Sequence, residues 1–122
     1  MKGMSYTQRT LRELRNRGVV CAVVERWNQF AGPHGVRQDL FGFIDICALY
    51  PGDKGIVGVQ STGPSGHAQH RKKILEDCEH ALDWLKSGGK IELWSWRKLK
   101  LKRGGKAERW FPRVEDITEE MF

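Results

Sequence analysis

A run of six small or β-branched residues, residues 19–24, places the strongest constraint on how this chain can fold. Residues of this kind favour a strand, and the run has neither the alternation of a half-exposed strand nor the spacing of a helix. A strand without a polar face must be covered on both sides. The sequence therefore predicts an α/β domain in which helices cover both faces of a sheet, and 122 residues are enough for one such domain.

The rest of the chain supplies the other elements of this domain. Apolar residues at three- and four-residue steps predict helices over residues 7–17 and 67–86. Alternating or apolar runs predict further strands over residues 39–49, 56–62, 91–101 and 107–113, with a loop over residues 28–36. The predicted order is a helix, three strands, a helix, a strand and a terminal basic β-hairpin. We expect a mixed, largely antiparallel central sheet flanked by helices, followed by an acidic tail over residues 114–122.

The distribution of charge points to a polyanionic partner. The formal net charge is +6, and it rises to +10 when the last eight residues, which carry four acidic and no basic side chains, are left out. A compact domain this basic favours nucleic acid, although solubility alone is an alternative explanation. Because no apolar run is long enough to cross a membrane and the first 17 residues do not form a signal peptide, we expect a cytoplasmic protein with no membrane contact.

Asp45 interrupts an otherwise apolar strand, residues 43–49. A carboxylate in a buried strand is costly unless it is paired or coordinates a metal. Asp39 lies six residues earlier, so a regular strand would place both carboxylates on one face. An ion pair between Asp45 and a basic residue such as Arg37, or a cap on neighbouring backbone, explains the aspartate equally well.

Gln60 and Thr62 follow Gly58 at two-residue steps, so all three lie on one face of the third predicted strand. A turn around residues 52–53 brings Gln60 close to Asp45. Carboxylate and amide oxygens suit a hard divalent cation, so we expect Mg²⁺ or Mn²⁺ to be held by Asp45, Asp39 and Gln60. Glu25 is a more distant candidate ligand, and we expect no small-molecule cofactor.

This order of elements, with an aspartate in the second strand, resembles the PD-(D/E)XK nuclease fold and, more narrowly, the archaeal Holliday junction resolvases. Residues 43–49 and 56–60 are similar to that family's aspartate strand and the E-x-K strand that follows it, and residues 37–73 also resemble small phage and prophage proteins. The resemblance implies a restriction-endonuclease-like αβββαβ fold over residues 1–122. It also implies a homodimeric, metal-dependent endonuclease acting on structured or branched DNA.

The chain departs from that family at the E-x-K motif. Its two positions fall on Gly58 and Gln60 in one register and on Gln60 and Thr62 in the other, so the glutamate and the lysine are both absent. The resemblance makes Asp45, Gln60 and Thr62 candidate catalytic residues, with Lys72 or a neighbour among residues 67–73 replacing the lysine. A catalytically degenerate DNA-binding module of the same fold is the alternative.

Two tryptophans and several basic residues lie close together between Trp94 and Arg103, a combination that suits nucleic acid because cations follow phosphates and rings can stack on exposed bases. Together with the start of the second helix, this pattern predicts DNA contacts by Arg71, Lys73, Lys98, Lys100, Lys102 and Trp96. Two alternatives stay open for the same residues. The lysines could protect a sheet edge while the tryptophans pack on a helix, or the tryptophans could lie in a homodimer interface.

Overall fold

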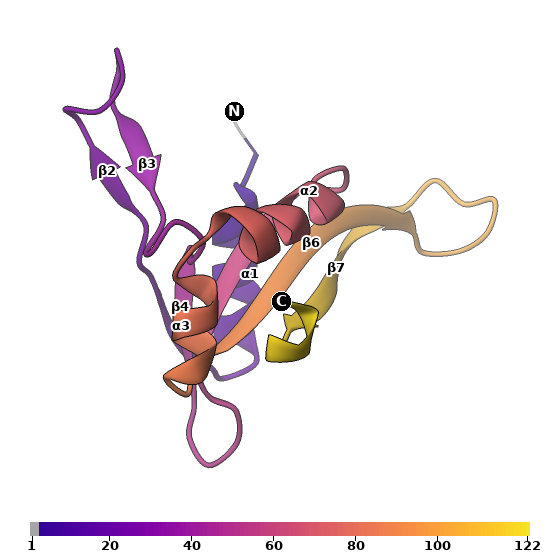
Figure 1. The fold of residues 1–122 in the computed structure, drawn as a ribbon. Coiled ribbons are helices and arrows are strands. Elements are labelled where there is room, and N and C mark those ends of the chain that lie inside the picture. Colours follow the sequence, from indigo (N-terminus) through magenta and orange to yellow (C-terminus); the bar gives the residue numbers. More distant parts are fainter. Residues whose placement is uncertain (1–2) are drawn as a thin grey trace.

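A computed structural model describes residues 3–122 and shows an α/β fold built on a five-stranded mixed sheet (Figure 1). The strand order is β1-β4-β5-β6-β7, and among the described strands only β5 and β6 pair in parallel. The predicted mixed, largely antiparallel sheet is therefore confirmed. The strands are β1 (Val20–Val23), β4 (Ile46–Tyr50), β5 (Gly55–Thr62), β6 (Lys90–Lys100) and β7 (Glu108–Ile117).

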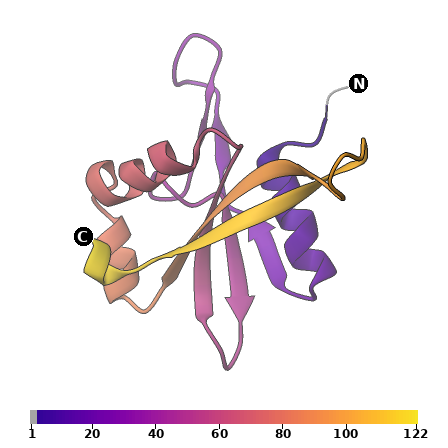
Figure 2. The same ribbon diagram turned by 90° about the vertical axis from the view of Figure 1, so that its right-hand side faces the viewer.

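Helix α1 (Tyr6–Asn16) covers one face of the sheet (Figure 2), and the helix predicted there is confirmed. Ser5 caps its N-terminus, because the Ser5 side chain accepts a hydrogen bond from the Gln8 backbone N–H. Its buried face carries Leu11 and Leu14. These two leucines pack on one core cluster with Ile46, Ala48, Val57, Val59, Trp94 and Trp96.

The opposite face is covered by α2 (His67–Lys72), a π-helical turn (Lys73–Asp77) and α3 (Ala81–Lys86). The single helix predicted over residues 67–86 is wrong, because the backbone becomes extended at Cys78 and the chain changes direction there. The break lets both pieces lie on the sheet. Ile74 and Ala81 are fully buried in the second core cluster, which also contains Phe43, Ile44, Ile91, Leu93 and Ile117.

Strand β4 begins later than predicted, because residues 39–45 form a tight turn. Leu40 forms an isolated antiparallel bridge with Ile44, and Phe41 and Gly42 have φ angles of 54° and 84°. Two consecutive residues in the left-handed region reverse the chain, so a continuous strand over residues 39–49 cannot form. The turn also places Asp39 opposite Asp45.

Strand β1 lies at the edge of the sheet and is not buried on both faces, contrary to the prediction for residues 19–24. Val20 is 67% exposed, because α1 covers one face of β1 while the helices of the other layer pack over the central strands. The expectation of two covering layers holds instead for β5 and β6, where residues 91–96 are all buried.

Two hairpins extend from the sheet (Figure 1). Residues 28–36, predicted as a loop, connect the short strands β2 (Arg26–Asn28) and β3 (Val36–Gln38). The predicted basic hairpin is confirmed as the far end of β6 and β7. However, β7 continues to Ile117, so residues 114–117 belong to the sheet rather than to a tail, because Ile117 is buried against Ile91. A 3-10 turn (Glu119–Met121) ends the chain. Among the helices of residues 3–122, none has the length and apolar character needed to cross a membrane.

Candidate metal centre

Three carboxylates, those of Glu25, Asp39 and Asp45, gather in one cluster, with one oxygen of each within 4.8 Å of the others. Glu25 directly precedes β2, Asp39 directly follows β3, and Asp45 directly precedes β4. The expected proximity of Asp39 and Asp45 is confirmed, but the tight turn at residues 40–44 brings them together, not alternation along one strand. Glu25, which the sequence indicated only as a distant candidate, is a full member of the cluster.

Gln60 adds an amide to the three carboxylates, as predicted. Its side chain is 1% exposed, and its Nε2 donates a hydrogen bond of 3.3 Å to Asp39 Oδ2. Its Oε1 is buried and has no hydrogen-bond partner among residues 3–122. A buried amide oxygen without a donor is unfavourable, and a bound cation would satisfy it. The three carboxylates fit a hard divalent cation such as Mg²⁺ or Mn²⁺, and the Gln60 amide lies beside them, in contact with Asp39.

Asp45 is the most electrostatically perturbed member of the cluster. Burial, a hydrogen bond shared with Asp39 and the negative charge of Asp39 raise the pKa of Asp45 to about 8. The Ser61 backbone N–H, which donates to Asp45 Oδ2 over 2.8 Å, opposes this rise. Arg37 lies 2.9 Å from Glu25, so the ion-pair partner that the sequence offered to Asp45 is held by another carboxylate. Without a cation, the Asp45 carboxyl therefore holds its proton at neutral pH, beside the charged side chains of Asp39 and Glu25.

Lys73, rather than Lys72, is the lysine at the cluster. Lys73 Nζ lies 4.0 Å from Asp39 Oδ2, at the start of the π-helical turn. The Lys72 side chain is 74% exposed and lies 3.9 Å from Glu76, so the structure does not support the choice of Lys72. His70 is close enough to Lys73 and Asp39 for their charges to act on it. Burial and the positive charge of Lys73 lower the pKa of His70, and the negative charge of Asp39 partly offsets this decrease.

Ser61 and Thr10 support the cluster from the α1 side, and sequence reasoning missed both. The Ser61 hydroxyl donates to Thr10 Oγ1 over 2.9 Å, and the Trp96 indole N–H donates to the same oxygen over 2.8 Å. Trp96 is 3% exposed, so the expectation that it stacks on DNA bases is wrong in this structure. Thr62 is also buried and packs against Gly66. The position of Thr10 beside Leu11 on the buried side of the helix could have indicated that its hydroxyl faces the sheet.

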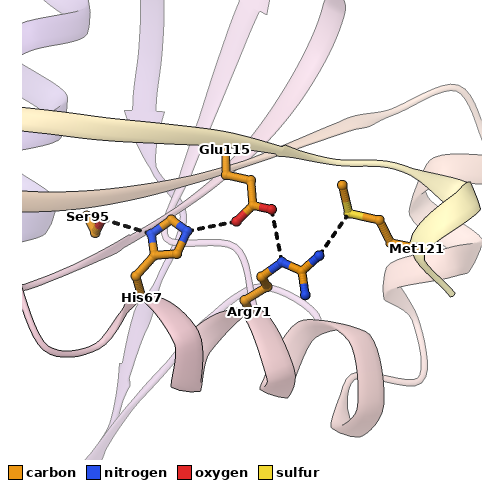
Figure 3. Close-up of polar contacts among 5 residues, drawn as sticks. All are labelled: His67, Arg71, Ser95, Glu115 and Met121. Atoms are coloured by element: carbon orange, nitrogen blue, oxygen red, sulfur yellow. Dashed lines mark hydrogen bonds and ion pairs between the residues drawn. The ribbon is translucent and has the colours of Figure 1, made fainter.

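Arg71 is held by an internal network rather than directed at the cluster (Figure 3). Its Nε donates to Glu115 Oε2 over 2.9 Å, while the other Glu115 oxygen lies 2.7 Å from His67 Nε2. His67 Nδ1 in turn lies 2.8 Å from Ser95 Oγ. Burial raises the pKa of Glu115, but the hydrogen bonds from His67 and Arg71 outweigh it and keep that pKa below its usual value. The network ties α2 to β6 and β7, so Arg71 has a structural role here.

The three lysines of the β6–β7 hairpin, Lys98, Lys100 and Lys102, are exposed as expected for residues that contact phosphates. Thr62, the last residue of β5, pairs with Ser95, and β6 continues five residues beyond that point. The basic hairpin therefore extends past the end of β5 at which Gln60 lies. The β2–β3 hairpin projects on the other side of the molecule (Figure 1), and Glu25 and Asp39 of the carboxylate cluster lie at its two ends.

Comparison of the chain with protein-family models, with curated proteins and with solved structures finds no match.

Proposed function

We propose that this protein is a divalent-cation-dependent endonuclease that hydrolyses phosphodiester bonds in structured or branched DNA, with a fold of the PD-(D/E)XK type that the sequence resembles. The observation that carries the proposal is the cluster of Glu25, Asp39 and buried Asp45, which the Gln60 amide contacts through Asp39. This donor set lies beside a lysine, on an edge flanked by a basic hairpin. Oxygen ligands can hold the divalent ion, the lysine ammonium group can stabilise charge on the phosphate, and the basic surface can bind the DNA backbone.

Each residue of the cluster has a distinct role in this proposal. Asp39, Asp45 and Glu25 hold the cation, and Gln60 contributes its free amide oxygen. The Ser61 backbone N–H fixes the orientation of Asp45. When bound, Mg²⁺ or Mn²⁺ would lower the pKa of a water molecule and stabilise charge on the attacked phosphate.

Lys73 takes the part of the missing motif lysine. Its ammonium group, 4.0 Å from Asp39, can contact a non-bridging phosphate oxygen and stabilise the charge that develops there. We place Lys98, Lys100 and Lys102 along the DNA backbone beyond the site. Because two symmetric cuts in a branched substrate need two active sites, we propose that the protein acts as a homodimer.

A DNA-binding module without catalysis is the second candidate, and one observation favours it. In one of the two registers of the resemblance Gln60 takes the place of the motif glutamate, and its amide contacts Asp39 in the cluster. An amide in place of a carboxylate removes one negative charge from the cation site. Such a protein would bind DNA through the same basic surface and leave it uncut.

The test is incubation of the pure protein with labelled single-stranded, duplex and four-way DNA, with Mg²⁺, with Mn²⁺ and with a chelator. We expect cleavage of four-way DNA only when a divalent cation is present. Asp45→Asn should abolish cleavage and keep DNA binding, because the substitution removes a ligand charge and barely changes shape. Binding without cleavage under every condition would favour the non-catalytic module, and absence of binding at low salt would refute both.

A further inference from the structure

The β2–β3 hairpin arises directly from the carboxylate cluster. Glu25 is the residue before β2, and Asp39 is the residue after β3. We call residues 26–38 the arm, and Figure 1 shows it at the upper left, projecting away from the sheet. Because two ligands of the candidate cation site form its two ends, whatever the arm touches is brought next to that site.

The tip of the arm presents one aromatic ring to solvent. Phe30 is 88% exposed, more than any other large hydrophobic residue among residues 3–122. Its backbone is fixed, because the Phe30 N–H donates to Asn28 Oδ1 over 3.0 Å. Below the tip, the Trp27 ring lies across Gly35 so closely that a Cβ at Gly35 would come within 2.3 Å of Trp27 Cζ2. The arm is therefore an ordered support for Phe30.

The charge and size of the arm favour nucleic acid over a protein partner. Residues 26–38 contain two arginines and a histidine and no acidic residue, and one of the arginines, Arg37, pairs with Glu25 at the base of the arm. A stable protein interface buries at least about 1,000 Å² in total, and the three exposed apolar side chains of a two-stranded arm, Trp27, Phe30 and Val36, offer less than that. By contrast, a single phenylalanine on a basic support is the device with which proteins wedge apart DNA base steps.

We infer that the arm inserts Phe30 between base pairs at a DNA branch point and thereby brings the neighbouring backbone to the carboxylate cluster. This inference rests on the proposed nuclease function and names the structural feature of the substrate that is recognised. Opening a base step costs a few kcal/mol in continuous duplex and less where stacking is already interrupted. Selection of branched DNA then follows from the lower cost of inserting the ring there.

The experiment uses four-way DNA with 2-aminopurine at the branch point or, in a second molecule, inside one helical arm. Ca²⁺ replaces Mg²⁺ so that the DNA stays uncut. We expect wild-type protein to increase the fluorescence of the branch-point probe alone. Phe30→Ala should remove this increase and weaken four-way DNA binding about tenfold, as loss of one aromatic stack does, while duplex binding is unchanged. Phe30→Trp should restore both.

Phe122→Ala is the matched control, because Phe122 is another exposed phenylalanine and lies at the C-terminus, away from the arm in both views (Figures 1 and 2). If Phe30→Ala binds four-way DNA as wild type does and raises the probe fluorescence equally, the wedge is refuted while the nuclease proposal stands. If no DNA is bound at low salt, both are refuted. If Phe30→Ala instead converts a dimer to a monomer in light scattering, the arm is a contact between protein copies and the wedge is refuted.

Discussion

Replacing Asp45 by asparagine should make the metal-free protein less sensitive to alkaline pH. The pKa of Asp45 is raised from 3.8 to about 8 in the folded protein, mainly by burial and by Asp39. A carboxyl whose pKa is higher in the folded state binds protons more tightly when folded. Its stabilising contribution is therefore complete below pH 3.8, shrinks as the pH rises, and is lost above about pH 8.

The structure sets the size of this effect. A tenfold difference in proton affinity between the folded and unfolded states corresponds to about 1.4 kcal/mol. Between 3.8 and about 8 the free energy of unfolding of wild type should therefore fall by up to roughly 6 kcal/mol relative to the asparagine variant. Sharing of the proton with Asp39 reduces this difference, so we expect the observed fall to be smaller than this upper limit.

The assay is urea unfolding followed by tryptophan fluorescence, from pH 5 to pH 8 in a chelator. The difference between wild type and Asp45→Asn reports the titration of the coupled Asp45 and Asp39 carboxyls, because the remaining titrating groups are common to both. Adding Mg²⁺ at pH 8 should stabilise wild type and leave the variant nearly unchanged, since a ligand stabilises the state that binds it. A difference that does not vary with pH would refute the reasoning and identify Asp45 as a structural hydrogen-bond acceptor for Ser61.

Three further outcomes are expected. Lys73→Met should lower DNA cleavage by at least about 100-fold in a gel assay while Lys72→Met changes it less than about twofold, because only Lys73 reaches the cluster; equal losses would show that both act through general charge. Substituting Lys98, Lys100 and Lys102 together by alanine should reduce the slope of log affinity against log salt by up to about 3, measured by fluorescence anisotropy, and an unchanged slope would remove the hairpin from the DNA interface. Light scattering at micromolar concentration should give the mass of a dimer, and a monomer would contradict the two-site scheme.

Elements with a strong local signal could be predicted from the sequence. The capped helix α1, the strand β5 and the alternation of β6 all follow from residue periodicity, and each was found where it was expected. The tight turn at Phe41 and the helix break at Cys78 were missed. Neither has a local signal strong enough to outweigh the apolar patterns around it, because packing of the chain on the sheet determines both.

The residues of the candidate site also fall into two groups, those that the sequence predicted and those that only the tertiary structure brought to the site. By itself, the sequence determined that Asp45 and Gln60 lie close together, since one turn pairs β5 with β4 and Asp45 directly precedes β4. The membership of Glu25 and Lys73 was decided only by the tertiary structure. Glu25 reaches the cluster because a 13-residue excursion, the arm, returns to its starting point at Asp39, and Lys73 reaches it because α2 lies across the sheet. Contacts between residues so distant in the chain depend on how whole elements pack, and no short sequence pattern encodes that packing.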